Sequence, residues 1–238
     1  MINKIHENTV WGQLSNLMSI PTDCPQRDER MGWMGDAHLS AEEAIYNFDM
    51  AAFYAKYLRD ISDAQKEDGS LSDVIPPYWS LYPADPAWGT AYITLAWYMY
   101  LYYGDISVLK EHYDGLKKYI ESLVRMSADN LISLEKYGDW CPPGSIKPKH
   151  TPGQFTSTWY YYHDVLIFSK IAEVLGNEVD RVKYSRLAEE IKKAFNDKFL
   201  QDERYLSASQ TCNALPLYLD MPPEEKKKAV LETLITVG

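Results

Sequence analysis

Cysteine is scarce in this sequence and follows no metal-binding pattern. The three residues, Cys24, Cys141 and Cys212, are odd in number and form no Cys-X-X-Cys pair. This excludes a regular disulfide framework and a cysteine-type zinc site. It predicts reduced thiols in a cytoplasmic protein, and we expect neither a cofactor nor a resident metal ion.

Positive charge is also in short supply. Lys and Arg number 24 against 34 Asp and Glu, which gives a formal net charge of −10. Basic residues are interspersed with acids, and even the run Lys226–Lys228 follows Glu224 and Glu225, as is typical of a solvated helix face. Nucleic acids and anionic membranes both require clustered Lys and Arg, so we expect neither as a partner.

No hydrophobic run is long enough to cross a membrane. A transmembrane helix needs about 20 apolar residues, and the longest candidate, Ala91–Tyr103, is shorter. Residues Met1–Val10 are polar and lack the basic and apolar regions of a secretory signal. We therefore expect neither a membrane span nor a signal segment in this chain.

Helical periodicity, by contrast, runs almost throughout. Apolar residues recur at three- and four-residue steps in several segments, whereas Ala91–Tyr103 is apolar on all sides and predicts a buried helix. Gly104–Asp105 and Gly176–Asn177 can each end one helix and cap the next. We expect helices near residues 4–18, 37–47, 49–66, 88–103, 106–127, 157–175, 178–199, 208–218 and 223–236.

Buried helices that alternate with amphipathic ones predict an all-α fold, with an inner ring of helices wrapped by an outer ring in an α/α toroid. An ordinary bundle or a solenoid also fits, although the absence of a fixed-period repeat weighs against a solenoid. Three segments rich in Pro, Gly, Asp and Trp interrupt the helices: Ile20–Asp36, Glu67–Ala87 and Ser127–Thr156. Long loops are usually functional or disordered, and the aromatic content here favours ordered loops whose rings can stack on sugars.

The segment Pro21–Asp36 concentrates the polar chemistry. Between Asp23 and Asp36 lie four carboxylates, two arginines, Trp33 and two glycines that allow close backbone approach. Glycoside hydrolysis needs a carboxylic acid that keeps its proton near neutral pH, and burial or neighbouring carboxylates raise a carboxyl pKa in that direction. On chemistry alone, a surface ion-pair network, helix caps and a calcium site without EF-hand spacing remain alternatives.

The string DCPQRDERMGWMGDA, residues 23–37, closely resembles the signature of glycoside hydrolase family 78, the bacterial and fungal α-L-rhamnosidases. The flanks Asn8–Gln13 and Tyr46–Asp49 match too, as do the later segments Asp85–Gly89 and Tyr137–Trp140. The resemblance covers essentially the whole chain. It implies a six-fold α/α barrel in a bacterial protein, inverting hydrolysis of terminal α-L-rhamnose, and a rhamnose-containing glycoside as the binding partner.

The same resemblance implies roles for individual residues. Glu29 matches the general acid of the family. The substrate-binding residues implied around the rhamnose pocket are Asp23, Arg27, Trp33, Asp36, Trp88 and Trp140. The two aspartates would hold sugar hydroxyls and the tryptophans would wall the pocket, whereas ion pairing with the carboxylates explains Arg27 equally well.

The chain departs from the family pattern in its later part. A six-fold barrel has six helix pairs and about nine helices are expected here, so we expect residues 1–238 to form a single catalytic domain without the C-terminal part of the barrel. No segment matches the family's general base, because Glu173, Glu189 and Glu190 lie in amphipathic helices typical of a surface. We expect the base outside this chain, and association of copies through uncovered apolar helices.

The leading hypothesis is therefore an inverting α-L-rhamnosidase with an incomplete site. A carbohydrate-binding remnant would bind rhamnose without hydrolysis. Another α/α-barrel glycosidase would share the acid but not the sugar. A purely structural helical module would bind no sugar and would disperse the three tryptophans.

Overall fold

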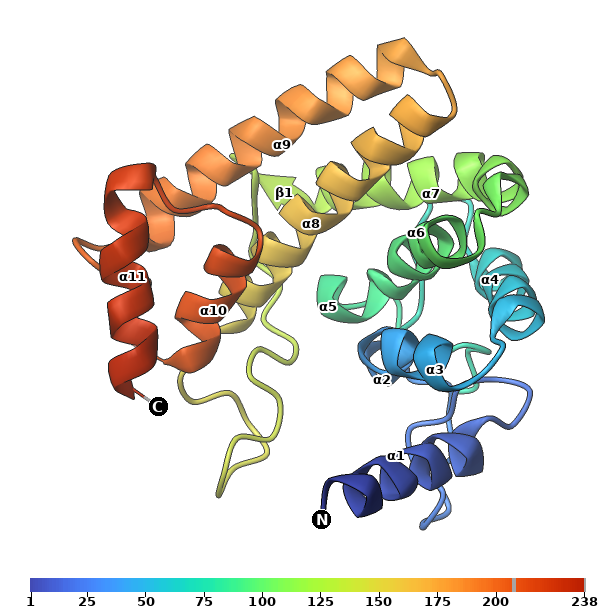
Figure 1. Ribbon diagram of the computed structural model, residues 1–238. Helices are drawn as coiled ribbons and strands as arrows, with labels where there is room; N and C mark the ends of the chain where they lie inside the picture. Colours follow the sequence, from blue (N-terminus) through green and yellow to red (C-terminus); the bar gives the residue numbers. More distant parts are fainter. Residues whose placement is uncertain (207–208, 238) are drawn as a thin grey trace. The chain divides into compact units, whose positions relative to one another are not determined.

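The computed structural model describes residues 1–206 and 209–237, and over this part the regular secondary structure is helical except for one short hairpin, with long loops between some of the helices (Figure 1). The expected all-α fold class is confirmed. The chain separates into two compact units, Met1–Ser122 with Glu173–Gly176, and Leu123–Ala172 with Asn177–Gly238. Among the described helices, none combines the length and apolar character that a membrane span requires.

The first unit contains the motif identified in the sequence. Its helices are α1 (Ile2–Asn16), α2 (Met34–Leu39), α3 (Ala41–Asn47), α4 (Ala51–Ala64), α5 (Pro86–Gly89), α6 (Ala91–Tyr103) and most of α7 (Ile106–Met126). Amphipathic α4 buries Tyr54, Tyr57, Leu58 and Ile61 and packs against α6, while α2 packs against both α5 and α6. Helix α2 therefore brings the motif against the centre of this unit.

Helix α6 ends and α7 begins at the expected pair of residues. Gly104 takes a left-handed conformation with φ of 67°, which an L side chain adopts at a cost. The Asp105 carboxylate then accepts a hydrogen bond of 2.9 Å from the backbone N–H of Ser107. This cap starts α7 immediately after α6.

The second unit contains the hairpin β1 (Ser127–Ala128) and β2 (Leu131–Ile132) and the helices α8 (Gly153–Val174), α9 (Glu178–Phe199), α10 (Gln210–Tyr218) and α11 (Glu224–Val237). The strands pair antiparallel. Four buried aromatic rings form the centre of this unit, Phe155, Phe195, Phe199 and Tyr205, with Phe155 and Phe195 centroids 4.8 Å apart. Asn177 caps α9 by accepting a hydrogen bond from the Asp180 N–H, as expected.

The first two long loops lock onto each other within the first unit. The Ile75 N–H donates to the Gly32 carbonyl at 2.8 Å, and the Met34 N–H donates to the Asp73 carbonyl at 2.9 Å. A Cβ at Gly32 would lie 1.9 Å from the Ile75 carbonyl oxygen, so only glycine allows this approach. These contacts join the two loops directly beside the motif.

Several helix boundaries differ from those expected. The helix expected over 37–47 is divided at Ser40 into α2 and α3, and the one expected over 88–103 begins earlier, as α5, and is divided at Thr90. The segment expected as a loop after α7 contains the hairpin. For α10, the expected start at residue 208 lies outside the described residues, and the helix begins at Gln210.

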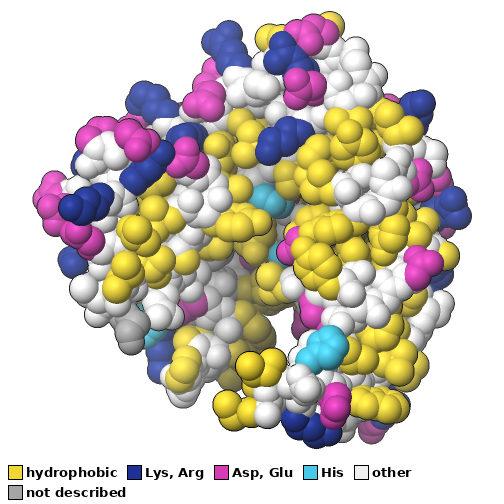
Figure 2. Space-filling view, viewed as in Figure 1, with side chains coloured by type: hydrophobic (Ala, Val, Ile, Leu, Met, Phe, Trp, Pro, Cys, Tyr) yellow, Lys and Arg dark blue, Asp and Glu magenta, His cyan; other side chains and the backbone are white. Residues whose placement is uncertain are grey.

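Charges are interspersed on the surface as the sequence predicts. Figure 2 shows Lys and Arg scattered among Asp and Glu on the visible face. The i, i+4 pairs Lys56–Asp60 and Arg186–Glu190 are examples of this alternation.

Candidate active site

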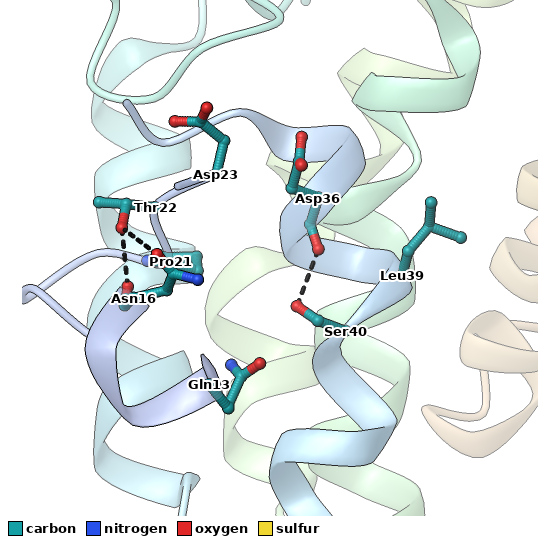
Figure 3. Close-up of a pocket in the computed structure, with 8 residues that line it drawn as sticks. All are labelled: Gln13, Asn16, Pro21, Thr22, Asp23, Asp36, Leu39 and Ser40. Atoms are coloured by element: carbon teal, nitrogen blue, oxygen red, sulfur yellow. Dashed lines mark hydrogen bonds between the residues drawn. The ribbon is translucent and has the colours of Figure 1, made fainter. Parts of the chain in front are cut away.

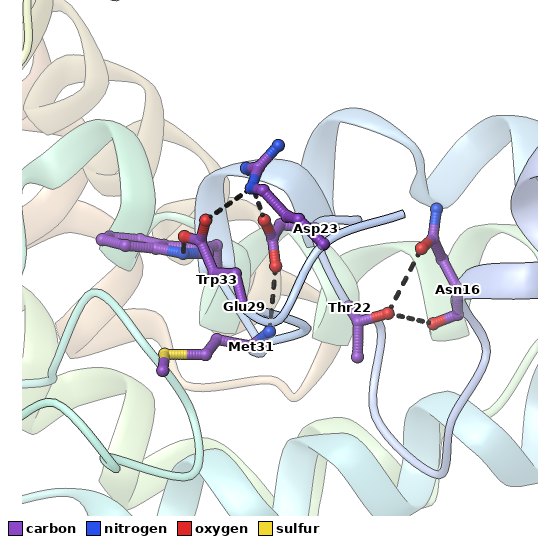
Figure 4. A network of polar contacts seen from close by, with 7 residues as sticks. Asn16, Thr22, Asp23, Glu29, Met31 and Trp33 are labelled. Carbon is purple, nitrogen blue, oxygen red and sulfur yellow. Dashed lines mark hydrogen bonds and ion pairs between the residues drawn. The ribbon is translucent and has the colours of Figure 1, made fainter. Parts of the chain in front are cut away.

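The motif begins with a loop that closes on itself. The Asp23 N–H donates to the Met31 carbonyl at 3.0 Å, and the Met31 N–H donates back to Asp23 Oδ1 at 2.9 Å. Thr22 ties this loop to the end of α1 through its hydroxyl, which donates to the Asn16 carbonyl at 3.1 Å (Figure 4). Arg30 takes a positive φ of 48°, which turns the chain back toward Met31. These contacts close the loop between Asp23 and Met31, in which Cys24 is buried and residues 25–28 are exposed.

Glu29 lies at the centre of a hydrogen-bonded network on this loop. Its Oε1 accepts from Trp33 Nε1 at 2.7 Å, and its Oε2 accepts from Arg27 Nε at 2.8 Å (Figure 4). The Arg27 guanidinium also donates to Asp23 Oδ2 at 3.1 Å. The Asp23 side chain is 5% exposed and that of Glu29 is 23% exposed, so Glu29 is the more accessible of the two carboxylates.

This network shifts the pKa of Glu29 in the direction opposite to the one expected for an acid. The hydrogen bond from Arg27 lowers the pKa of Glu29, and the bond from Trp33 adds to the effect, while partial burial acts against both. No neighbouring carboxylate contributes to this shift, and the Arg27 guanidinium bonds to both Glu29 and Asp23. The expectation that neighbouring carboxylates keep Glu29 protonated is wrong for the unliganded chain, in which Glu29 is a carboxylate at neutral pH.

Within the motif, Asp36 is a carboxyl whose pKa is raised. It lies in the first turn of α2 and lines a pocket of about 330 Å³ together with Gln13, Asn16, Pro21, Thr22, Asp23, Leu39 and Ser40. Figure 3 shows the Asp23 and Asp36 carboxylates at the same end of this pocket. Part of the Asp36 side chain contacts solvent there. The protein around it displaces water from the carboxyl, and this desolvation raises its pKa to about 6, with further contributions from the charges of Asp23 and Glu29.

Trp88, in the short helix α5 that follows the second loop, contacts the same helix. A Cβ at Gly35 in α2 would lie 2.7 Å from Trp88 Cε2, so the indole packs directly on the glycine backbone. The Asp85 carboxylate caps α5 by accepting from the Ala87 N–H at 2.9 Å, and His38 Nε2 forms a 2.8 Å hydrogen bond with the Ala87 carbonyl oxygen. These contacts fix Trp88 against the helix that carries Asp36.

The structure therefore brings most of the predicted site residues together. Asp23, Arg27, Glu29 and Trp33 form one bonded network, and Asp36 and Trp88 lie on or against α2. Trp140 belongs to the second unit, where its ring contacts Tyr137 with centroids 5.4 Å apart. Its place in the site stays a prediction, and so do the substrate-binding roles of the others.

Ligand atoms of Asp23, Cys24 and Glu29 lie within 4.8 Å of one another, close enough for a metal ion. However, both carboxylates already pair with the Arg27 guanidinium. Burial and a hydrogen bond to Asp23 also raise the pKa of the Cys24 thiol, whereas ligation requires the thiolate. These groups fit an ion pair with Arg27 better than a cation site.

Two buried aspartates position the site, of which Asp85 belongs to the segment Asp85–Gly89 noted in the sequence and Asp73 was not identified there. Asp73 Oδ1 accepts a 2.7 Å hydrogen bond from the Asp85 N–H, and Asp85 in turn caps α5. Asp85–Pro86 is a recognisable helix start, because aspartate is a preferred cap and proline is favoured in the first turn. No comparable local signal marks Asp73, whose partner is 12 residues away in the sequence.

Comparison with known proteins adds a consistent set of matches. The family model described as the bacterial α-L-rhamnosidase six-hairpin glycosidase domain matches residues 1–237. An α-L-rhamnosidase of Streptomyces avermitilis is 34% identical over 238 residues, which is all of this chain and 22% of that protein. The solved structure of an α-L-rhamnosidase from Dictyoglumus thermophilum is 66% identical with a TM-score of 0.96, covering 98% of this chain and 27% of that one.

A further solved structure, the Streptomyces avermitilis α-L-rhamnosidase complexed with L-rhamnose, is 32% identical with a TM-score of 0.92. It covers 99% of this chain and 22% of that one. The chain therefore spans about a quarter of the length of the relatives that it matches. Six helical hairpins correspond to the (α/α)6 toroid expected from the sequence, so the matches agree with that fold class.

Proposed function

Since the chain belongs to the family of bacterial α-L-rhamnosidases with a six-hairpin glycosidase domain, we propose that it carries the acid half of an α-L-rhamnosidase active site. The reaction proposed is inverting hydrolysis of terminal α-L-rhamnose from rhamnosides. Glu29 is the general acid, and the general base comes from outside these 238 residues. The Streptomyces avermitilis relative with bound L-rhamnose supports the choice of sugar.

The observation that carries this proposal is the fixed position of Glu29. Trp33 and Arg27 hold its two oxygens, Asp23 shares the same arginine, and Asp36 influences the same site electrostatically. A proton donor fixed beside further carboxylates suits a reaction in which positive charge develops on the sugar ring. Asp23 and Asp36 would accept hydrogen bonds from sugar hydroxyls, and Trp33 and Trp88 would face the apolar side of the ring.

Glu29 must hold a proton when the glycosidic oxygen arrives. A bound rhamnoside that excludes water from Glu29, or that takes over the hydrogen bonds of Arg27, raises the Glu29 pKa because both changes disfavour the charged form. In the unliganded chain Asp36, with a pKa of about 6, holds a proton more readily. The assignment of the acid therefore needs a test that separates Glu29 from Asp36.

That test compares Glu29→Gln with Asp36→Asn on two substrates, an aryl rhamnoside with a good leaving group and an alkyl rhamnoside with a poor one. Azide is supplied as the nucleophile so that the absence of a base does not limit the rate. Loss of a general acid should lower turnover of the alkyl rhamnoside about 10²–10⁴-fold and that of the aryl rhamnoside far less. Asp36→Asn should lower both rates by similar factors, because it weakens sugar binding.

The opposite pattern would reassign the roles. A leaving-group-dependent loss in Asp36→Asn, with equal losses in Glu29→Gln, would make Asp36 the acid. Binding of free L-rhamnose, measured by calorimetry, should survive Glu29→Gln in either case. It therefore serves as the folding control for Glu29→Gln, whereas the folding of Asp36→Asn, in which sugar binding is expected to weaken, is checked by its urea unfolding midpoint.

Location, source and association are further parts of the proposal. Buried free thiols at Cys24 and Cys212 support a cytoplasmic protein, and the bacterial family model supports a bacterial source. The net charge of −10 supports a neutral sugar as the partner and argues against nucleic acid or an anionic membrane. Association of copies is supported by the apolar residues that α1 exposes, Ile2, Ile5 and Leu14.

A further inference from the structure

A second pocket lies against Glu29, separate from the one that Asp36 lines. Its volume is about 440 Å³, within the range of small-molecule sites. One part of its lining is charged and includes Asp28, Glu29 and Arg30. The rest is largely apolar and comprises Ile20, Met31, Gly32, Val74, Pro76 and Tyr78.

The two locked loops keep this pocket open. Trp33 and Val74 pair in an antiparallel bridge between the loops, next to the 2.8 Å hydrogen bond from the Ile75 N–H to the Gly32 carbonyl. Val74 and Ile75 are buried, so the floor of the pocket belongs to the core of the first unit. Figure 4 shows the Met31 side chain extending in the same direction as Trp33, beneath Glu29.

Aromatic side chains are exposed at this pocket. Tyr78 lines it and is 81% exposed, and the adjacent Trp79 is 42% exposed. The Trp79 ring contacts the Trp33 ring edge to face with centroids 5.9 Å apart, and Trp33 donates directly to Glu29. Large rings open to solvent beside an acid are positioned to cover an apolar ligand.

The position of Glu29 indicates where the sugar and the leaving group of the substrate would lie. A general acid protonates the glycosidic oxygen, which lies between the sugar and the leaving group. If the sugar is held by Asp23 and Asp36, the leaving group lies on the other side of Glu29. The apolar pocket contacts Glu29 and contains neither Asp23 nor Asp36.

We propose that the pocket formed by Ile20, Met31, Val74, Pro76 and Tyr78 binds the leaving group of the rhamnoside, and that it selects a planar apolar group such as an aryl ring. The ring would stack on Tyr78, and polar substituents at its edge would meet Asp28 and Arg30. This inference rests on the proposed role of Glu29. The inference adds to that function a preference for the leaving group, which is the part of the substrate other than rhamnose.

The test measures binding to the full chain with thioglycosides, which resist hydrolysis. The probes are phenyl 1-thio-α-L-rhamnoside, methyl 1-thio-α-L-rhamnoside and free L-rhamnose, each titrated by calorimetry. We expect the phenyl compound to bind at least about tenfold more tightly than the methyl compound, because it buries several more apolar carbons. Tyr78→Ala should weaken phenyl binding about three- to tenfold and leave methyl binding within about twofold, whereas Tyr78→Phe should retain the preference.

Tyr46→Ala is the matched control. Tyr46 is also an exposed tyrosine of the first unit, at 71%, but it contacts Tyr102 and lines neither pocket. Its substitution should leave all three affinities unchanged. Equal affinities for the phenyl and methyl compounds, or equal weakening of both by Tyr78→Ala, would overturn the leaving-group pocket while L-rhamnose binding still supported the proposed function. If none of the three probes binds, both the proposed function and this inference are wrong.

Discussion

At the scale of single residues, one cation, Arg27, has the largest effect on the pKa of Glu29. Arg27 donates hydrogen bonds to Glu29 and to Asp23, and its side chain is 56% exposed, so packing does little to fix its position. A charge-assisted hydrogen bond to the ionised form lowers a carboxyl pKa. Arg27 therefore both orients Glu29 and keeps it deprotonated in the free chain. A bound substrate has to change the contact between Arg27 and Glu29 before Glu29 can transfer a proton.

Replacing Arg27 should reverse this shift. In Arg27→Gln the side chain can still donate a hydrogen bond but carries no charge, so we expect the pKa of Glu29 to rise above its value in the unsubstituted chain. The measurement is the pH titration of the Glu29 side-chain carboxyl by carbon-13 NMR. Arg30→Gln is the control, because Arg30 lines the adjacent pocket but makes no contribution to the Glu29 shift. An unchanged Glu29 titration in Arg27→Gln would show that Arg27 does not set this pKa.

The ion pair between Arg27 and Glu29 also makes the stability of the fold depend on pH. The Glu29 pKa is lower in the folded chain than its ordinary value of 4.5, so the pair stabilises the fold above that pH. The stabilisation is lost as the pH falls through the lowered value. The urea midpoints of the parent chain and Arg27→Gln should therefore converge on acidification, from a difference that is small because the pair is largely exposed.

At the scale of elements, the sequence predicted long helices better than short ones. Helices α4, α7 and α9 carry apolar periodicity over many residues, and Gly104–Asp105 ends and caps its helices as expected. The short helices α2 and α5 depend on each other instead, because Trp88 packs on Gly35 and His38 bonds to the Ala87 carbonyl. Such tertiary contacts leave no local pattern, so their boundaries were not predictable from periodicity.

Some features of the candidate site were predictable from the sequence and others were not. The motif around Glu29 was identified from local residue types and a family resemblance, and its members do contact one another. The direction of the Glu29 pKa shift was not predictable, because it depends on whether the Arg27 side chain folds back onto Glu29, which the order of residues does not reveal. The pocket lined by Val74, Pro76 and Tyr78 was also missed, since it forms only when two loops about 40 residues apart in sequence pair at Gly32 and Ile75.

The pairing of these loops can be tested at Gly32. In Gly32→Ala the new methyl group would lie 1.9 Å from the Ile75 carbonyl oxygen, so the loops must separate. We expect a loss of stability of about 1–3 kcal/mol, measured by urea unfolding followed by tryptophan fluorescence.

Gly12→Ala provides the matched control within the same unit. Gly12 lies inside α1, and nothing comes within 4 Å of a Cβ built there. Alanine is favoured over glycine in a helix interior, so this variant should gain about 0.5–1 kcal/mol. Equal effects of the two substitutions would contradict a special close approach at Gly32.

At the scale of the whole molecule, the main question is how an acid without an assigned base can act. The chain spans about a quarter of its relatives, and all the catalytic chemistry proposed here belongs to the first unit. An inverting mechanism needs a base to activate water on the face of the sugar opposite the acid. We propose that none of the 238 residues supplies that base, so hydrolysis by this chain in plain buffer should be very slow.

A small anionic nucleophile removes the need for a base, because it attacks without losing a proton. With azide and an activated aryl α-L-rhamnoside, we expect azide-dependent release of the phenol and formation of the inverted β-rhamnosyl azide, identified by proton NMR. The stereochemistry matters, because attack from the face opposite the leaving group gives only the β product. Glu29→Gln should retain most of this reaction on a good leaving group, while formate, another small anion, should also support phenol release.

Three other outcomes have different meanings. Brisk hydrolysis without azide would show that a base lies within the chain or comes from a second copy, and rates that rise with the square of chain concentration would identify the second copy. An α-configured azide would exclude direct inversion. Binding of L-rhamnose with no turnover under either condition would favour the carbohydrate-binding remnant, in which Arg27 keeps Glu29 permanently ionised.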